Sequence, residues 1–337
     1  MHVAHTSHFH AGISGSKDSS QSLGFKRMAS RDLVIGMIFS LQTVVGILGN
    51  FSILYFYLFL HLTGCKLRST DLILKNLAVA NLLVFFPKGV PQMMAGFGLK
   101  DFLNDFGCKF VFYVHRVSRD VSIGTTCLLS VFQTMTISPL NSRWAELKVK
   151  AHKYIATSNI FCWILNLMLN ISLPLYMTAK INNTNFTQRE DYGYCDAILD
   201  GTVTLTIYVA LILCRDGFFL VLIVSASSFM VFILHRHKQQ VQYMQRNNLS
   251  PRSSPESTAT QSILVLVCTF VSLWTLSSIS LICLTVLNNL SWWLRDTSEL
   301  IHACFPTVSP YILINYDSRV PRVCFAWNGI RNPLNFS

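Results

Sequence analysis

The fold is decided by one stretch near the N-terminus, LVIGMIFSLQTVVGILGNFSILYFYLFL, which runs from Leu33 to Leu60 without a charged residue. About 20 apolar residues are enough for a helix to cross the hydrocarbon core of a bilayer. A basic turn with Lys66 and Arg68 follows the stretch, as is common at the cytoplasmic end of a span. The stretch therefore predicts a transmembrane helix.

Similar apolar stretches recur along the rest of the chain. They run over residues 72–94, 108–137, 154–177, 205–234, 262–287 and 299–314. Together with the first stretch they predict an all-α membrane protein, a seven-transmembrane helix bundle over residues 31–317. The polar residues 1–30 are expected to form a disordered extracellular segment, and residues 318–337 a short cytoplasmic tail.

The composition excludes an ordinary soluble enzyme. Hydrophobic residues make up 51% of the 337 residues and charged residues only 13%, against roughly 25% charged residues in a typical soluble domain. Seven spans leave only short loops, with no room for a separate catalytic domain. No catalytic residue, cofactor site or metal site is therefore predicted, and the four histidines of residues 1–10 are read as part of a disordered tail.

The distribution of positive charge indicates the orientation in the membrane. The first, third and fifth loops and the C-terminal tail hold 13 Lys and Arg residues but only four acidic residues. Basic loops stay in the cytoplasm, so the N-terminus is expected outside and the C-terminus inside. The net charge of +11 is thereby explained as a topology signal, which leaves no support for nucleic-acid binding.

The cysteines test this topology. Of the ten cysteines, six lie within predicted spans and two, Cys65 and Cys324, lie on the reducing cytoplasmic side. Only Cys108 and Cys195 remain on the oxidising side, where disulfides form. We predict a disulfide between them, and two free thiols are the alternative.

The glycosylation sequons give a second test. Four of the seven Asn-x-Ser/Thr sequons are predicted to lie inside spans or in the cytoplasm, at Asn50, Asn170, Asn248 and Asn335. Asn289 lies in a short loop close to the membrane. Asn182 and Asn185 lie in the polar external loop that also carries Cys195, and we predict glycosylation there.

Several motifs resemble the vomeronasal type-1 receptors, a family of pheromone receptors. The motifs are LRSTDLIL from Leu67, KGVPQM from Lys88, HRVSRDVSIGTTCLLSVFQ from His115, YGYC from Tyr192, HRHKQQVQ from His235 and SPRSSPE from Ser250. The resemblance covers residues 28–327. It implies a multi-pass plasma-membrane receptor that binds small organic chemosensory ligands within the bundle. It also implies a heterotrimeric G protein, of the inhibitory class, as the partner, with membrane lipid around the spans.

The chain departs from related patterns at defined positions. Asn81 stands where rhodopsin-like receptors usually carry an aspartate, and the acidic-Arg-Tyr triplet expected near Gln133 is absent, as is typical of the vomeronasal group. Vomeronasal receptors commonly carry a Pro-Asp pair in span five, but this chain has Arg215-Asp216. A proline would bend the helix, whereas arginine keeps it regular and adds a charge.

The third predicted span carries four ionisable side chains at His115, Arg116, Arg119 and Asp120. At 1.5 Å per residue they lie roughly 10 to 18 Å past Cys108, near the middle of the bilayer. Charged side chains are costly at that depth and mark functional sites by default. Two interpretations remain open: the polar floor of a ligand pocket, or an ion-pair network that fixes helix packing.

We assign two of these four residues to the ion-pair network and two to the ligand pocket. Arg116 and Asp120 are four residues apart and are predicted to form a structural ion pair. His115 and Arg119 are predicted to face the ligand. Asp216 of span five and Lys88 of span two are predicted to supply further partners for the cluster if those helix faces point inward. The ligand-binding candidates are Lys88, Phe112, Tyr113, His115 and Arg119.

The third cytoplasmic loop begins with the basic residues Arg236 and Lys238, which we predict to contact a G protein. Topology alone would also explain their charge. A different class of function is a seven-helix transporter or proton-translocating protein that uses Arg116, Arg119, Asp120 and Asp216 as a relay. No inverted repeat supports this alternative.

Overall fold

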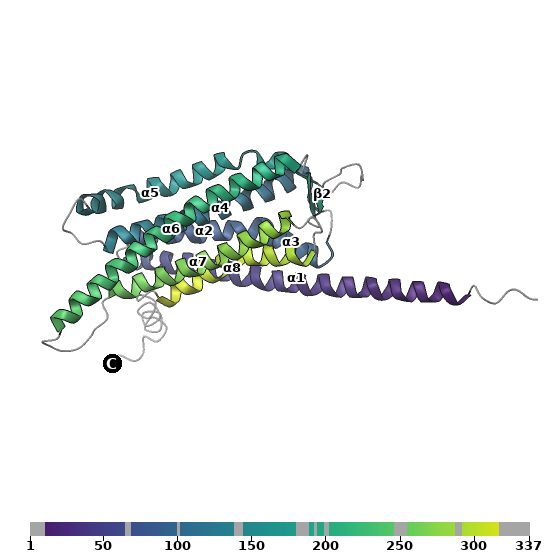
Figure 1. The fold of residues 1–337 in the computed structure, drawn as a ribbon, viewed down its shortest axis with the longest axis horizontal. Helices are drawn as coiled ribbons and strands as arrows, with labels where there is room; N and C mark the ends of the chain where they lie inside the picture. The colour runs from purple at the N-terminus through teal and green to yellow at the C-terminus, as the bar shows by residue number, and fades with distance from the viewer. Residues whose placement is uncertain are drawn as a thin grey trace, which may run out of the picture.

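The computed structural model describes residues 11–64, 69–99, 102–137, 144–179, 189–191, 194–198, 202–245, 255–286 and 292–316. Seven long helices dominate these residues (Figure 1). Six of them are α1 (Ala11–Leu62), α4 (Asp105–Ile137), α5 (Trp144–Leu169), α6 (Thr202–Gln245), α7 (Pro255–Val286) and α8 (Trp292–Tyr316). The seventh is interrupted and consists of α2 (Ser69–Val84), the π-helical turn η1 (Phe85–Gly89) and α3 (Val90–Gly96).

Helix α1 begins earlier than the sequence predicts. It starts at Ala11, well before the apolar stretch, and extends past the other helices at one end of the bundle (Figure 1). Residues 1–10 lie outside the described part, and the disorder of the N-terminal segment stays a prediction. No proline occurs between Ala11 and Leu62, so no residue of this segment is unable to continue the helix.

Four helical segments of the described chain are long and apolar enough to cross a membrane. They are Leu33–Leu62, Thr70–Ala95, Lys153–Tyr176 and Ala210–Ile233, and a shorter apolar segment covers Leu264–Ser280. Large apolar side chains such as Leu41, Met168 and Leu211 are exposed on α1, α5 and α6. Exposed apolar faces of this kind are suited to contact with lipid acyl chains.

Helix α4 lies at the centre of the bundle, which explains how it tolerates polar residues. It packs against α2, α5, α6 and α7. Val121 and Thr125 are completely buried, so the middle of this helix is shielded from lipid on its packed faces. A helix that is surrounded by others can carry charges, provided that its neighbours supply partners.

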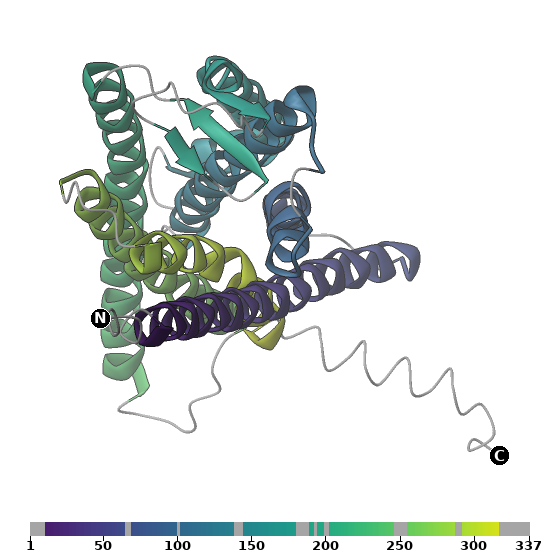
Figure 2. The same ribbon diagram turned by 90° about the vertical axis from the view of Figure 1, so that its right-hand side faces the viewer.

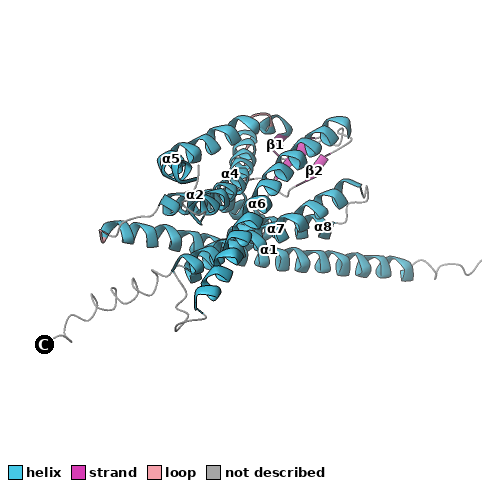
Figure 3. Cartoon of the chain, turned by 60° about the vertical axis from the view of Figure 1, so that its left-hand side comes forward, coloured by secondary structure: helices cyan, strands magenta, loops and turns pink. Residues whose placement is uncertain are grey.

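A small antiparallel sheet lies outside the helical spans, and the sequence does not predict it. The order of its strands is β1 (Met177–Ala179), β3 (Cys195–Ile198) and β2 (Arg189–Asp191). In the register of β1 and β3, Ala179 lies opposite Cys195. Figure 2 shows the sheet at one end of the bundle, and Figure 3 shows that strands are confined to this place in the described chain.

A neutral hydrogen-bond network ties the middle of four helices together. Asn81 Nδ2 of α2 donates to Asn50 Oδ1 of α1 at 3.2 Å and to Ser309 Oγ of α8 at 3.0 Å. Ser122 Oγ of α4 donates to Asn81 Oδ1 at 2.8 Å. All these side chains are buried, and each bond joins groups that would be costly to leave unpaired in the interior. The amide of Asn81 makes this junction without a formal charge.

Candidate ligand site in the helix bundle

The outer end of the site is closed by a disulfide-anchored loop. Cys108, in the first turn of α4, is bonded to Cys195 of β3, with 5.9 Å between their Cα atoms. This confirms the predicted pairing. Both cysteines are completely buried. The bond therefore fixes the sheet to the outer end of the central helix.

The buried aromatic side chain of Tyr194 packs beside the disulfide. Its ring stacks on Phe102 and on Phe112, with 6.0 Å between ring centroids in each pair. Burial raises the pKa of the Tyr194 phenol far above its ordinary value, so this hydroxyl stays protonated and neutral. Phe112, a predicted ligand contact, is thus packed against the loop.

Lys88 is held by an ion pair that the sequence does not predict. The residue lies in the π-helical turn η1, and its Nζ atom pairs with Glu299 Oε2 of α8. It also lies 5.9 Å from the centroid of the Phe112 ring, within the range of a cation–π interaction. The pair joins the outer halves of the second and last helices of the bundle. The sequence gives no signal for this role of Glu299, because the residue stands at the predicted boundary of its span.

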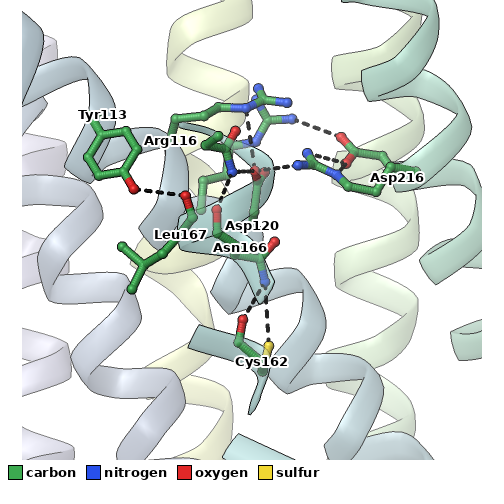
Figure 4. A network of polar contacts seen from close by, with 10 residues as sticks. Tyr113, Arg116, Asp120, Cys162, Asn166, Leu167 and Asp216 are labelled. Carbon is green, nitrogen blue, oxygen red and sulfur yellow. Dashed lines mark hydrogen bonds and ion pairs between the residues drawn. The ribbon is translucent and has the colours of Figure 1, made fainter. Parts of the chain in front are cut away.

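A buried cluster of charges connects α4 with α6 (Figure 4). Arg215 Nη1 lies 2.6 Å from Asp120 Oδ2, and Arg215 Nη2 lies 2.8 Å from Asp216 Oδ1. Both carboxylate side chains are almost fully buried, with 2% and 4% exposure. One guanidinium therefore binds a carboxylate on its own helix and another on the central helix.

The predicted pair of Arg116 and Asp120 is present but is not the shortest contact of this carboxylate. Arg116 Nε lies 3.6 Å from Asp120 Oδ2, which also accepts a hydrogen bond of 2.8 Å from Asn170 Nδ2, just after the end of α5. Arg215 approaches the same oxygen more closely. The partner of Asp120 on another helix was not predicted because the spacing of residues in a sequence reveals only pairs within one helix.

The two residues predicted to face a ligand have different environments. The side chain of His115 is turned toward α2, where its Nδ1 lies 3.2 Å from the Val84 carbonyl oxygen. A carbonyl oxygen can only accept, so Nδ1 carries the proton. Arg119 Nη2 lies 3.6 Å from Asp216 Oδ2, and its side chain keeps 20% exposure. Arg119 thus reaches an open space, whereas His115 is occupied by the backbone of a neighbouring helix.

Tyr113, another predicted ligand contact, is half-buried and bonded to α5. Its hydroxyl donates a hydrogen bond of 2.8 Å to the Leu167 carbonyl of α5 (Figure 4). The contact holds α4 against α5. The structure therefore gives this residue a packing environment rather than a place beside Arg119.

Arg119 lines a small cavity between α4, α7 and α8. The cavity has a volume of about 40 Å³ and is lined by Arg119, Ser122, Ile123, Phe270, Leu273, Trp274, Ser277, Ile301, His302, Phe305 and Pro306. Ser277 Oγ of α7 is hydrogen-bonded to the imidazole of His302 of α8. The cavity combines an aromatic wall with a few polar groups, a lining typical of small-molecule sites, but its volume is far below the roughly 300 to 1,000 Å³ of such sites.

The sequence contains a signal for part of this cavity. His302 is an ionisable residue inside a predicted span and meets the same criterion that pointed to Arg119. Ser277 and Trp274 carry no such signal, since serine and tryptophan are common in apolar helices. Their role emerges only when α7 is packed against α8.

The chemistry of the site is that of binding. Among the residues that the structure describes, no group of three or more His, Cys, Asp and Glu could hold a metal ion. The charged groups of the cluster are engaged with one another across helices. They can orient a ligand and connect its binding to the relative positions of α4 and α6.

The predicted sites in the loops are only partly described. Asn182 and Asn185 lie outside the described residues, so their glycosylation stays a prediction. Arg236 lies on the exposed surface of α6, while the side chain of Lys238 is outside the described part.

A second, more open hollow of about 590 Å³ lies between α7 and α8, lined by Val265, Tyr311, Ile312, Ile314 and Asn315.

Seven long helices, an outer loop fixed by a disulfide to the central helix, and a polar cavity between helices define the class of seven-helix membrane receptors. Comparisons with known proteins identify the branch of that class. Residues 33–326 match the family described as "Vomeronasal organ pheromone receptor family". The chain belongs to this family.

Individual relatives agree with this assignment. The chain is 55% identical over 300 residues to Vomeronasal type-1 receptor 4 of Homo sapiens, which covers 89% of this chain and 99% of that receptor. It is 54% identical over 307 residues to Vomeronasal type-1 receptor 3 of Homo sapiens, with 91% and 98% covered. A more distant relative is Olfactory receptor class A-like protein 1 of Danio rerio, with 28% identity over 286 residues, 85% of this chain and 90% of that protein.

The family confirms the resemblance drawn from the motifs. The chain is a multi-pass membrane receptor of the G-protein-coupled class, and a G protein and a ligand are its partners in general terms. Receptors of this family have no enzymatic activity of their own, which agrees with the prediction that the chain is not an enzyme.

Proposed function

We propose that this receptor binds a small organic chemosensory ligand within the helix bundle and activates a heterotrimeric G protein of the inhibitory class. The observation that carries the proposal is the cavity beside Arg119. Helices α4, α8 and α7 supply a guanidinium, an imidazole and an aromatic wall there, through Arg119, His302 and Trp274. A molecule bound at such a junction contacts α4, α7 and α8 at once.

The charge cluster supports a route from ligand to G protein. Arg119, which lines the cavity, is paired with Asp216, and Arg215 joins that residue to Asp120. A ligand that draws Arg119 toward the cavity changes the balance of contacts between α4 and α6. Because ligands shift a conformational equilibrium only through different contacts in its two states, this cluster is a suitable element for such a shift. We place the G-protein contacts at the cytoplasmic end of α6, beginning with Arg236 and Lys238.

The alternative of a proton relay finds no support in this geometry. Two of its four proposed members, Arg116 and Arg119, are guanidinium groups, which do not release protons in proteins. The membership of a receptor family also argues against transport. Binding and conformational coupling account for the same charges without proton transfer.

The test is a ligand screen in cells that express the full chain at the surface, with nucleotide exchange on a heterotrimeric G protein as the readout. The expected result is saturable activation by at least one small organic compound, abolished by pertussis toxin, which blocks the inhibitory class. Activation that resists the toxin would remove the G-protein class from the proposal. Ligand binding without nucleotide exchange on G proteins of any class would contradict the proposed function.

A further inference from the structure

The starting point is a tyrosine hydroxyl that is buried without a hydrogen bond. Tyr194 is 1% exposed, and among the residues that the structure describes its Oη atom has no hydrogen-bond partner. The hydroxyl of Tyr311, by contrast, donates to the Val45 carbonyl at 2.9 Å. Burying a hydroxyl without a partner costs folding free energy, so such a group calls for an explanation.

Tyr194 belongs to a group of side chains at the outer end of the bundle. Its ring stacks on Phe112 of α4 at 6.0 Å between centroids, and Lys88 Nζ lies 5.9 Å from the same Phe112 centroid. Lys88 is in turn paired with Glu299 of α8. Burial, and after it the negative charge of Glu299, raises the pKa of Tyr194, which places Glu299 near the phenol. We call these four side chains the outer group.

The outer group lies on the same two helices as part of the cavity lining. On α4, Phe112 and Arg119 are seven residues apart, and on α8, Glu299 and His302 are three residues apart. Both spacings keep side chains on one face of a helix. At 1.5 Å per residue, the outer group lies roughly 5 to 10 Å farther out than the cavity.

The size of the cavity brings the outer group within reach of a ligand. A volume of about 40 Å³ holds only one end of a small organic molecule. The rest of a ligand that enters the cavity must extend along the helices that line it. On α4 and α8, this direction leads to the outer group.

The chemistry of the hydroxyl defines which ligand atom it binds. The phenol of Tyr194 stays protonated, so it can donate a hydrogen bond to a carbonyl or ether oxygen. A hydrocarbon of the same shape offers no acceptor and would leave the hydroxyl unpaired. An oxygen at this place therefore gains a hydrogen bond that takes no donor away from another described residue.

We propose that Tyr194 contacts the ligand, and that its hydroxyl donates a hydrogen bond to a carbonyl or ether oxygen and thereby selects oxygen-containing ligands. The inference rests on the proposed function and adds to it the chemical class of the ligand and a contact outside the cavity. The same hydroxyl lowers the stability of the ligand-free receptor, because it is then buried without a partner.

The first measurement is thermal unfolding of the ligand-free, full-length receptor purified in detergent. Tyr194→Phe removes the unpaired hydroxyl and keeps the ring, so its unfolding midpoint should be at or above that of wild type, by up to about 4 °C. Tyr311→Phe is the matched control. It removes a hydroxyl that is hydrogen-bonded, and should lower the midpoint. The same chemical change should thus destabilise the receptor at only one of the two tyrosines.

The second measurement compares two probes of nearly the same shape, 2-nonanone and 2-methylnon-1-ene, in which a methylene group replaces the carbonyl oxygen. For each probe, the shift of the unfolding midpoint is followed against concentration, a readout that needs no G protein. The preference for the ketone over the alkene should be about fivefold or more greater in wild type than in Tyr194→Phe, as one hydrogen bond implies.

Two control variants should keep the preference of the wild-type receptor for the ketone. One is Tyr311→Phe, which changes a tyrosine that is not part of the outer group. The other is Lys109→Gln, which removes a positive charge from the outer end of α4, where Lys109 pairs with Asp105.

Defined outcomes overturn the inference. A lower midpoint of ligand-free Tyr194→Phe would show that the hydroxyl is already bonded, to the protein or to a bound water. An unchanged preference in Tyr194→Phe, or a wild-type receptor that neither probe stabilises, contradicts the ligand contact. A preference that depends on Tyr194, without nucleotide exchange on any G protein, would support this inference while contradicting the proposed function. Activation by hydrocarbons as strong as by ketones would leave the proposed function standing and remove this inference.

Discussion

At the scale of single residues, the decisive contacts join helices that are far apart in sequence. Asp120 illustrates this, since its partner four residues away, Arg116, is 3.6 Å distant while Arg215 from α6 is 2.6 Å distant. The ionisable residues of the third span could be recognised from sequence as a polar centre. Their pairing could not, because it depends on how α4 and α6 are rotated against each other.

The first prediction concerns these two pairs. Removing one partner of a buried ion pair typically costs about 3 to 5 kcal/mol. Arg215→Gln should lower the unfolding free energy more than Arg116→Gln, and the coupling energy with Asp120→Asn should be larger for Arg215 than for Arg116. The measurement is thermal unfolding of the purified single and double variants. Equal coupling for the two arginines would show that the closer contact carries no additional stability.

At the scale of secondary-structure elements, close helix contacts depend on small residues. A Cβ atom added at Gly46 of α1 would lie 2.3 Å from the ring of Phe85, which is buried in the first position of η1. A Cβ atom added at Gly217 of α6 would meet nothing within 4 Å. Both glycines lie inside an apolar helix, but only Gly46 is closely packed against another residue.

The second prediction follows from this difference. Gly46→Ala should destabilise the receptor by about 1 to 3 kcal/mol, since the Phe85 ring must move in a packed interior. Gly217→Ala is the matched control and should be neutral or stabilising by up to about 1 kcal/mol, because alanine favours helix. The measurement is the thermal unfolding midpoint of each variant, compared with that of the wild-type receptor. A destabilised Gly217→Ala, or an unaffected Gly46→Ala, would contradict the packing of α1 on η1.

The third prediction concerns the loop between α5 and α6. The disulfide joins residues that are 87 positions apart, and a bond that closes so long a loop contributes about 4 to 5 kcal/mol in the chain-entropy description. Cys108→Ala and Cys195→Ala should each strongly reduce surface expression, and the double variant should be no worse than either. Flow cytometry of intact cells gives the comparison. Normal expression of both single variants would mean that the bond is dispensable for folding.

At the scale of the whole molecule, the seven-helix architecture was accessible from composition and charge distribution. The positive-inside pattern and the two external cysteines predict the orientation, and apolar stretches predict the spans. The extension of α1 back to Ala11 and the sheet of residues 177–198 were not predicted. Neither has a hydrophobic pattern of its own: the extension precedes the apolar stretch, and the strands are only three or four residues long.

The fourth prediction tests the orientation of the whole chain. The glycan-transferring enzyme acts in the lumen, which becomes the outside of the cell. Asn182 or Asn185 should therefore carry glycan, and Asn248 should not. Enzymatic deglycosylation of variants that keep one sequon each, followed by gel electrophoresis, gives the answer. Glycan at Asn248 would invert the proposed topology.

The most direct test of the central claim, that ligand binds between α4, α7 and α8, is a dose–response measurement on cells that express His302→Ala. A compound that activates the wild-type receptor should require about tenfold or more higher concentration with this variant, as expected for loss of a polar ligand contact of about 1.5 kcal/mol. Surface expression should stay close to that of wild type, and Lys109→Gln should respond as wild type does. Unchanged potency in His302→Ala, at equal surface expression, would contradict the account.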